Sequence, residues 1–409
     1  MLAAGMRESL ITDHRFRFVL FRNTVKSSAD SVTPVNTTST SPFGLEHIRE
    51  QPHRPMSPHN DNPILHFITT YHDLNLTAVH ELHSLPTPLD FSRFVRQNRP
   101  FVVRNGASEW RAIHVWHATY LAQTMHRQPV NVACTPKGNA DAIVEDEHGG
   151  LMYVEPYETS EPFEDFLKYV QEDTSLLQNS RSHIPPRTVK YAQTQNDNLR
   201  DEYSNLFADV PADISFATLA LHQEPDAINF WLGNERSTTS LHKDNYENIY
   251  VQVRGQKHFV LLPPVEMPCV NEKPVPFARF QPTSENSLEL TPLLKPDADP
   301  IPVPTWDPDE PQLRATEYSV LSQPIRISLN EGDMFYLPAM WYHKVSQSSG
   351  TEGFSCSVNY WYDMSFEGTF WAQNAFLRDV YNTQTRQVAY PAFRFGEKSE
   401  DESDAPSIS

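Results

Sequence analysis

The chain has 409 residues, of which 33 are Lys or Arg and 52 are Asp or Glu, so its formal net charge is −19 at pH 7. This acidity argues against nonspecific binding to DNA or to an anionic membrane; it favours a basic protein partner or serves to keep the protein soluble. Three cysteines without paired spacing exclude a zinc module recognisable from the sequence and indicate a reducing compartment. No apolar run reaches the length of a membrane span. We therefore expect a cytoplasmic protein, with the nucleus as a second location.

The two ends of the chain predict segments without a packed core. Residues 1–62 predict a flexible arm, because Ser, Thr and Pro recur through SSADSVTPVNTTSTSPF and EQPHRPMSPHNDNP. Its basic residues resemble a mitochondrial presequence, but Glu8 and Asp13 interrupt them, so we favour a tail without a targeting role. Residues 396–409 predict an acidic disordered tail. One domain over residues 63–395 remains, a size that barrels and sandwiches reach as a single unit.

Residues 69–124 predict helices around one short strand. Apolar side chains recur at helical spacing after Pro88, whose missing N–H costs nothing at a helix start. PFVVRNG predicts a strand closed by an Asn-Gly turn, and Trp110–Thr124 predicts a further helix. Three histidines in or just after this helix (His114, His117 and His126) have no carboxylate companion, so we expect packing or surface roles for them.

Further along, short strands alternate with helix and loop. VNVACTP and LMYVEP predict two strands around a loop at Lys137–Gly150. Phe163–Tyr169 then predicts an amphipathic helix, and Arg187–Asn196 predicts a strand.

The most informative stretch is NFWLGNERSTTSLHKDNYENIYVQVRGQKHFVLLPP, from Asn229 to Pro264. His242 and Asp244 lie two residues apart, so they point to the same side of an extended chain and can coordinate one metal ion together. A third ligand is then needed, and GDMFYLPAMWYHKV supplies His343 in a second strand-like run. Two imidazoles and one carboxylate on one face of a metal leave other positions open, which is the arrangement of non-haem Fe(II) oxygenases.

Polar side chains beside this triplet predict a second ligand. Lys257 lies in an apolar strand, where an ammonium is costly unless an anion meets it. The Arg254-Gly255 turn folds that strand back beside the triplet. Thr239 and Asn248 add a hydroxyl and an amide in the same place. Together with a metal that still has open coordination positions, these groups suit a small dicarboxylate.

Five segments resemble the JmjC (cupin-like) Fe(II)/2-oxoglutarate oxygenases in the same order along the chain. They are LHSLPTPLDFSRFVRQNRPFVVRNGASEW, VACTPKGNADAI, AINFWLGNERSTTSLHKDNYENIYVQVRGQKHF, GDMFYLPAMWYHKV and VNYWYDM, and they cover roughly Leu82–Phe370. The resemblance implies an α+β fold with an all-β core, a double-stranded β-helix (jelly-roll) with helices packed outside. It also implies Fe(II) at His242, Asp244 and His343, with 2-oxoglutarate and O2 as co-substrates.

The resemblance assigns two more residues to the co-substrate. Tyr191 takes the place of a tyrosine whose hydroxyl meets the far carboxylate of 2-oxoglutarate beside Lys257; the sequence by itself favours an aromatic packed in the core. Asn359 takes the place of a residue near the co-substrate, although SSGTEG lengthens the turn that precedes its strand.

The same resemblance implies a protein hydroxylase that acts on a lysyl residue, with a developmentally regulated GTP-binding protein as substrate. Demethylation of methylated lysine or arginine and peptidase action on histone tails are the alternatives. No chromatin-reader module, zinc cluster, H-E-x-x-H motif or nucleophile motif accompanies them in the sequence. We therefore expect a protein partner with a basic segment, and neither nucleic acid nor a membrane.

Two regions near the C-terminal half keep alternatives open. Met267–Gln323 is dense in proline, which cannot donate to a β ladder, so we expect a long loop with edge segments. Its acids Asp307, Asp309 and Glu310 form either a substrate rim or a solvated cover. Ser365–Thr385 predicts a helix with one apolar face, for which the resemblance implies a homodimer contact; a lid or core packing is the alternative.

Overall fold

The computed structural model describes residues 62–179, 188–195, 197–284 and 289–385. The chain divides into two units, Met1–Asn62 and Pro63–Ser409, and every described residue except Asn62 belongs to the second. The predicted N-terminal arm, apart from Asn62, and the predicted acidic tail therefore lie outside the described residues.

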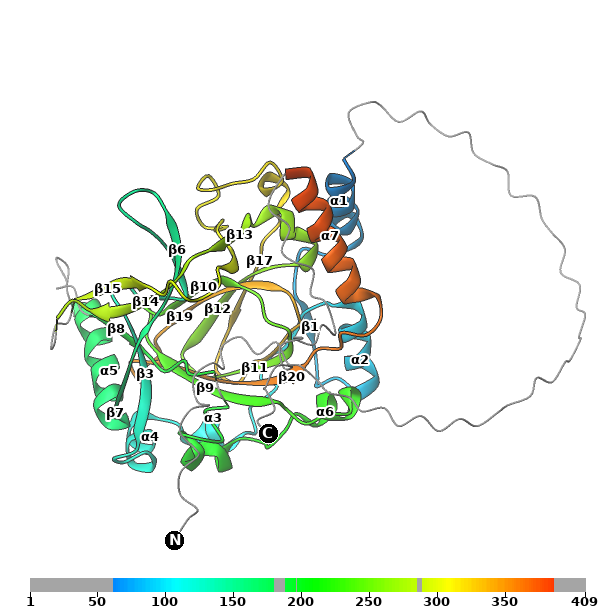
Figure 1. Cartoon of the computed structure of the whole chain (residues 1–409). Helices are drawn as coiled ribbons and strands as arrows, with labels where there is room; N and C mark the ends of the chain where they lie inside the picture. The colour runs from blue at the N-terminus through cyan, green and yellow to red at the C-terminus, as the bar shows by residue number, and fades with distance from the viewer. Residues whose placement is uncertain (1–61, 180–187, 196, 285–288, 386–409) are drawn as a thin grey trace, which may run out of the picture. The chain divides into compact units, whose positions relative to one another are not determined.

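Two facing sheets form the centre of the second unit (Figure 1). The six-stranded sheet has the order β1 (His80–Leu82), β2 (Phe101–Val103), β18 (Met334–Leu337), β11 (Tyr246–Arg254), β20 (Ser355–Asp363) and β9 (Ala227–Gly233). The five-stranded sheet has the order β17 (Ile325–Leu329), β12 (Gln256–Leu262), β19 (Tyr342–Ser348), β10 (Thr238–His242) and β4 (Asn139–Ala140). From β9 to β12 and from β17 to β20 the chain changes sheet at every strand. Two such interleaved windings make a double-stranded β-helix, and the predicted fold is confirmed.

Alternating side chains fill the barrel between the sheets. Phe259 and Leu261 of β12 meet Tyr250 of β11 and Phe335 of β18 in one buried cluster. The intervening residues of β11 face outward into a different cluster, because neighbouring side chains of a strand point to opposite faces. Burial on both faces explains why these strands are apolar over long runs.

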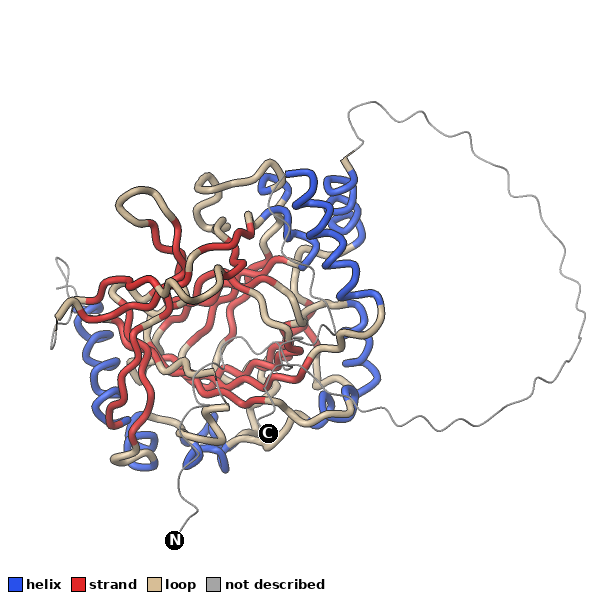
Figure 2. The backbone as a smooth tube through the Cα atoms, viewed as in Figure 1, coloured by secondary structure: helices blue, strands red, loops and turns tan. Residues whose placement is uncertain are grey.

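Helices cover the outside of both sheets (Figure 2). Five of them contribute side chains to the cluster on the outer face of the six-stranded sheet: α2 (Pro88–Gln97), α3 (Arg111–Val115), α4 (Ala118–Thr124), α5 (Phe163–Asn179) and α6 (Ser215–Leu221). Two helices lie side by side against the five-stranded sheet, with a 3-10 turn between: α1 (Pro63–Leu74), α7 (Thr369–Thr385) and η2 (Pro264–Cys269). The other 3-10 turns are η1 (Ser204–Asp209) and η3 (Ser319–Leu321).

Smaller sheets extend the barrel; they correct one loop prediction and form the edge segments that were expected in another. The loop expected at Lys137–Gly150 contains β4 and β5 (Ala142–Glu145). The expected loop Met267–Gln323 contains β13 (Glu272–Val275), β14 (Phe277–Pro282), β15 (Leu290–Leu294) and β16 (Ile301–Pro304). Its prolines fit because these strands form only a two-stranded ribbon (β13-β16) and one side of a four-stranded sheet (β15-β14-β6-β5). The other strands are β6 (Leu151–Glu155), β7 (Tyr157–Pro162), β3 (Pro129–Thr135) and β8 (Val189–Tyr191), the last three forming a sheet in the order β7-β3-β8.

Three element boundaries also differ from the sequence pattern. The helix expected at Trp110–Thr124 is interrupted, because His117 is extended and its ring Nδ1 accepts a hydrogen bond from Tyr120 N–H to cap α4. The helix predicted at Phe163–Tyr169 continues to Asn179, and within residues 188–195 the strand expected at Arg187–Asn196 covers β8 alone. His117 thus has a local structural role rather than a metal-binding one.

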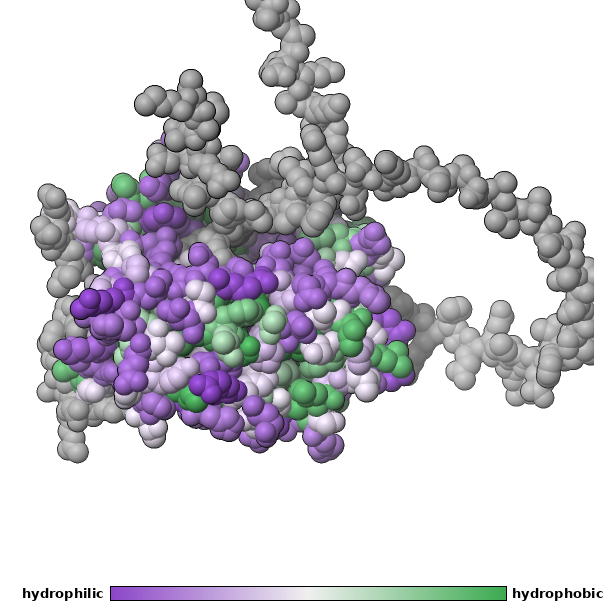
Figure 3. All heavy atoms as spheres, turned by 90° about the horizontal axis from the view of Figure 1, so that it is seen from below, coloured by the Kyte–Doolittle hydropathy of each residue, from purple (hydrophilic) through white to green (hydrophobic). Residues whose placement is uncertain are grey.

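The C-terminal helix α7 packs against its own chain. Leu377 and Tyr381 are buried in the cluster that α1 and η2 share, which is the core-packing alternative for this helix. The homodimer stays a prediction. No described helix has the length and apolar character needed to cross a membrane. On the face shown in Figure 3, hydrophilic residues surround separate hydrophobic areas.

Candidate metal centre

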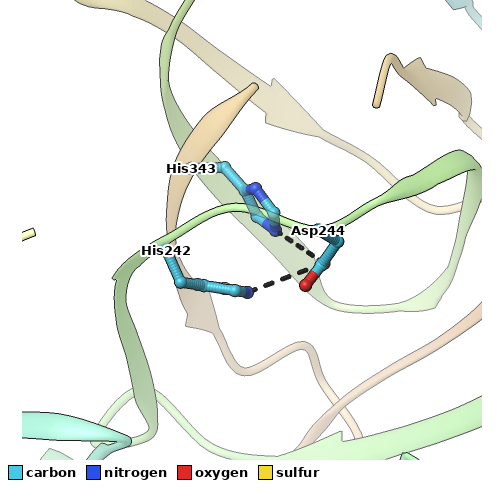
Figure 4. Close-up of side chains that lie close together, drawn as sticks. All are labelled: His242, Asp244 and His343. Atoms are coloured by element: carbon cyan, nitrogen blue, oxygen red, sulfur yellow. Dashed lines mark ion pairs between the residues drawn. The ribbon is translucent and has the colours of Figure 1, made fainter. Parts of the chain in front are cut away.

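The predicted triplet comes together at the ends of two neighbouring strands. His242 is the last residue of β10, Asp244 follows it, and His343 on β19 lies directly opposite His242. Their ligand atoms lie within 4.8 Å of one another, and no second group of this kind occurs among the described residues. Figure 4 shows the two imidazoles and the carboxylate converging.

A β-bulge in β10 aims His242 into the barrel. Thr239 pairs with Val345 and His242 pairs with His343, so three steps along β10 match two steps along β19. The extra residue places Thr239 and His242 on the same inner face, which simple alternation would not do. The bulge therefore brings the predicted hydroxyl and the first metal ligand to one side.

Backbone carbonyls fix the orientation of both imidazoles. His242 Nδ1 lies 2.8 Å from the carbonyl oxygen of Ser240, and His343 Nδ1 lies 3.0 Å from that of Trp341. An Nδ1–H that donates there leaves each Nε2 as a free lone pair. The Nε2 atoms are 3.8 Å and 3.6 Å from Asp244 Oδ2, too far for hydrogen bonds but suited to a shared ion.

Burial sets the protonation of these ligands. It lowers the pKa of His343 well below its usual value, and neighbouring His242 lowers it further, so the neutral ligand form is favoured. Burial also raises the pKa of Asp244, which the charge of His242 partly offsets. A divalent cation supplies the counter-charge that this carboxylate lacks, and two imidazoles with one carboxylate fit Fe(II).

Lys257 lies deep in the barrel with Tyr191. Its side chain is 1 % exposed, and its Nζ donates to the Tyr191 hydroxyl at 2.7 Å. None of the described carboxylates lies within ion-pair distance of Lys257, and burial lowers its pKa to about 7. A buried amine that meets only a hydroxyl is prepared to receive an anion. The structure thus brings together the two residues predicted to hold the far carboxylate of 2-oxoglutarate.

The strand register relates Lys257 to the metal ligands. On β12, Leu261 pairs with His343, and Lys257 lies four residues earlier, about 13 Å along the strand. A lysine side chain and a five-carbon diacid together bridge that separation. The turn at Gly255 makes this return possible, because its φ is +67° and a Cβ there would lie 2.6 Å from the Ser348 carbonyl oxygen.

Gly233, at the end of β9, makes room for this pair. A Cβ at this position would lie 2.6 Å from Tyr191 Cδ2, 2.7 Å from Gln347 Nε2 and 2.8 Å from Ser237 Oγ. Gly233 was not singled out from the sequence, although a glycine inside an apolar strand is a signal of close approach. The buried Ser237 Oγ and Gln347 Oε1 have no hydrogen-bond partner within the described part of the chain, so polar capacity remains here.

A relay of amides joins the predicted Asn248 and Asn359. Trp231 Nε1 donates to Asn359 Oδ1 at 2.7 Å, and Asn359 Nδ2 donates to Asn248 Oδ1 at 3.0 Å. An indole can only donate, so the direction of the relay is fixed from Trp231 onward. Asn248 therefore keeps its own NH2 group for a further acceptor in the barrel. Trp231 was missed from the sequence, because its partner is 128 residues away.

Two of the predicted rim acids are instead neutralised on the outer face. Lys344 Nζ donates to Asp307 at 2.7 Å and to Asp309 at 2.8 Å, and Arg326 also binds Asp309. Lys344 points away from the barrel interior, because it follows the inward His343 on the same strand. Asp307 and Asp309 therefore act as a cover rather than as a substrate rim. Glu310 beside them is exposed.

A buried charge cluster behind the metal centre was also missed. Lys243 lies between His242 and Asp244 in the sequence, and its Nζ binds Glu272 Oε2 and the Tyr342 hydroxyl. That hydroxyl donates to Glu272 at 2.8 Å. Arg378 of α7 approaches Glu272 at 3.6 Å. Tyr342 precedes His343, so the Glu272 carboxylate binds residues that are adjacent in the sequence to all three ligands. Lys243 and the nearby Arg378 together hold the pKa of Glu272 below its usual value, overcoming the opposing effect of burial.

A double-stranded β-helix with a His-Asp-His centre and a buried lysine defines the class of 2-oxoglutarate-dependent dioxygenases. Residues 86–368 match the cupin-like domain family. The chain belongs to this family, within the JmjC group, and it is an oxidoreductase. The resemblance seen in the sequence is therefore confirmed, and the family generally uses Fe(II) and 2-oxoglutarate.

Three relatives match most of the catalytic unit. The bifunctional peptidase and (3S)-lysyl hydroxylase JMJD7 of Homo sapiens is 37% identical over 292 residues, which are 71% of this chain and 85% of that protein. The lysine-specific demethylase JMJ32 of Arabidopsis thaliana is 34% identical over 300 residues, covering 71% of this chain and 83% of that protein. JmjC domain-containing protein E of Dictyostelium discoideum is 31% identical over 317 residues, covering 73% and 88%.

Proposed function

We propose that this enzyme hydroxylates a lysyl residue of a protein substrate, with Fe(II) as cofactor and 2-oxoglutarate and O2 as co-substrates. The observation that carries the proposal is the pairing of two sites in one barrel: the His242–Asp244–His343 centre and the buried Lys257 with its Tyr191 hydroxyl. The name of the human relative supports lysine as the target. A developmentally regulated GTP-binding protein is our first candidate substrate.

The chain's own residues bind and orient the reactants. His242, Asp244 and His343 would hold the metal, which when bound would couple O2 activation to the conversion of 2-oxoglutarate to succinate and CO2. Lys257 and Tyr191 bind the far carboxylate of 2-oxoglutarate through a charge-assisted pair of donors.

Three polar residues complete the co-substrate site in this proposal. Asn248 presents the NH2 group that the amide relay leaves unused, and Asn359 holds Asn248 in that orientation. Thr239 adds a hydroxyl on the same inner face as His242. The apolar side chains around them, such as Phe259 and Leu261, exclude water and so strengthen each polar contact.

Demethylation is the second candidate, because the Arabidopsis relative is named a lysine-specific demethylase. It would use the same centre on an N-methyl group and release formaldehyde. Peptidase action is the third, from the name of the human relative. It would shorten the substrate chain without consuming 2-oxoglutarate.

Mass spectrometry separates the three reactions. Candidate basic proteins, the GTP-binding protein first, are incubated with the enzyme, Fe(II), 2-oxoglutarate and O2, with Asp244→Ala as the matched control. We expect a gain of one oxygen atom on a lysyl residue, with one succinate released per product and no formaldehyde. Formaldehyde from a methylated peptide without any oxygen adduct on the unmethylated one would establish the demethylase instead.

A further inference from the structure

The side chain of Trp361, on β20, faces the barrel interior. Trp361 pairs with Asn248 of the neighbouring strand β11, so the two side chains point to the same face of the six-stranded sheet (Figure 1). Asn248 accepts a hydrogen bond from Asn359, which accepts one from Trp231, a member of the buried cluster between the sheets. The indole of Trp361 therefore lies inside the barrel, on the sheet opposite the two histidines of the metal centre.

The same indole lies at about the depth of the metal centre. The strands β11 and β12 both run from the turn at Gly255 toward that centre, one in each sheet. Asn248 precedes this turn by seven residues, and Leu261, which pairs with His343, follows it by six. Because the rise per residue is nearly constant along a strand, Asn248 and Trp361 lie across the barrel from His343.

An aromatic stack fixes the orientation of this indole. The rings of Tyr246 and Trp361 lie parallel, with their centres 4.7 Å apart and an angle of 2° between their planes. Burial raises the pKa of Tyr246, and the charges of nearby carboxylates, Asp244 among them, raise it further. The stack is therefore within electrostatic range of the metal-binding carboxylate.

The indole N–H of Trp361 lacks an acceptor. The side chain is 6 % exposed, and its buried Nε1 atom has no hydrogen-bond partner in the part of the chain that the structure describes. A buried indole usually finds a partner, and an indole can only donate, so the group that completes it must bring an acceptor oxygen. The co-substrate is already held by Lys257, Tyr191 and Asn248 in the proposed function. The donor is thus left for the other reactant, the protein substrate.

A lysyl substrate brings such an oxygen close to the metal centre. No carbon of a lysine side chain is more than four bonds from its Cα, so the main chain lies within about 5 Å of the carbon that reacts. A backbone carbonyl that enters the barrel loses its water and needs a new donor. The lysine side chain itself offers only donors. The acceptor that the substrate presents there is consequently a backbone carbonyl.

We propose that the indole N–H of Trp361 donates a hydrogen bond to the backbone carbonyl oxygen of the substrate lysine. The inference rests on the proposed function and names a substrate-binding residue for it. The Tyr246 ring holds the indole, and the hydrogen bond fixes the main chain so that a side-chain carbon reaches the metal centre. An N-methyl carbon is two bonds farther from the main chain than the last side-chain carbon. The contact therefore favours oxidation of the lysine carbon chain over demethylation.

A double-mutant cycle tests this contact without turnover. The full chain, loaded anaerobically with Fe(II) and 2-oxoglutarate, is titrated with two fluorescent peptide pools that have random flanks and a central lysine. The lysine carbonyl is an ordinary amide in one pool and a thioamide, whose sulfur is a weaker acceptor, in the other. We expect wild type to bind the amide pool about fivefold tighter, as for one hydrogen bond. Trp361→Phe should weaken binding of the amide pool by about the same factor and remove the difference between the pools.

Matched variants separate this contact from a structural effect. Trp110→Phe removes an indole that packs against Tyr360 on the outer face of the same sheet, and it should leave the difference between the pools unchanged. Tyr246→Phe keeps the stacked ring and should also retain the difference. Wild type that does not distinguish the pools would overturn the contact. So would a Trp361→Phe variant in which the difference persists, whether or not both affinities fall.

Two further readouts separate this contact from the co-substrate site and from the reaction. The Kd for 2-oxoglutarate should be the same in Trp361→Phe and wild type; a weaker Kd in the variant, with peptide binding unchanged, would assign the indole to the co-substrate and overturn the inference. Absence of oxygen adducts from wild type in the mass-spectrometric assay, with the difference between the pools intact, would instead overturn the proposed reaction.

Discussion

Lys257 should take up a proton when 2-oxoglutarate binds at alkaline pH. Burial lowers its pKa to about 7 in the free protein. The ligand carboxylate then stabilises the ammonium and raises this pKa, so that binding above pH 7 draws a proton from solution. Below pH 7 the amine is already charged and no proton is needed.

The size of the effect follows from that pKa. At pH 8 about nine tenths of the free amines are neutral, so the apparent Kd for 2-oxoglutarate should be about tenfold weaker than at pH 6, or about 1.4 kcal/mol. The folding stability of the ligand-free protein should change with pH in the opposite direction. Its unfolded chain binds more protons than the folded one above pH 7, so its stability rises with pH there.

Anaerobic calorimetry in two buffers of different ionisation enthalpy measures the proton uptake. We expect nearly one proton per ligand at pH 8 and almost none at pH 6. Lys257→Met should abolish the uptake and weaken binding by about 2–5 kcal/mol, as for a buried charge pair that loses one partner. A Kd that is the same at pH 6 and pH 8, with no proton uptake, would refute this role of Lys257.

Three substitutions test other parts of the site. Asp244→Ala should abolish succinate release while the fold is retained, because it removes the one anionic metal ligand; unchanged succinate release would reject the metal assignment. Gly233→Ala should destabilise the protein by about 1–3 kcal/mol in urea unfolding and raise the KM for 2-oxoglutarate, since the new methyl group displaces the Tyr191 ring. Glu272→Gln should cost about 3–5 kcal/mol, because the buried Lys243 ammonium loses its counter-charge, and anaerobic titration should show weaker Fe(II) binding. Normal Fe(II) affinity in a folded Glu272→Gln variant would show that the cluster behind the centre is not coupled to it.

The family resemblance predicted the barrel, and local pattern picked out the three candidate metal ligands. His242 and Asp244 are neighbours in the chain, and the strand that carries His343 is marked by its own apolar run. The inward position of His242, however, depends on a β-bulge that only the pairing with β19 reveals. The predicted Tyr191 came from the family resemblance, because its contact with Lys257 joins strands 66 residues apart.

The residues that sequence reasoning missed depend on long-range packing. Gly233 matters only because the Tyr191 ring lies against it, and Glu272 lies in a proline-rich stretch that was interpreted as loop. For the acids Asp307, Asp309 and Glu310 the sequence left a substrate rim and a solvated cover open, and cations on the outer face of the barrel bind two of these acids.

We propose above all that this enzyme adds oxygen to an unmodified lysyl side chain. The most direct measurement is tandem mass spectrometry of a lysyl peptide after reaction in 18O2, with succinate and formaldehyde quantified in the same sample. We expect one 18O atom on the lysine carbon chain, one succinate per modified peptide and no formaldehyde. Peptide cleavage without 2-oxoglutarate, or formaldehyde in proportion to succinate with no 18O retained on the lysine, would contradict it.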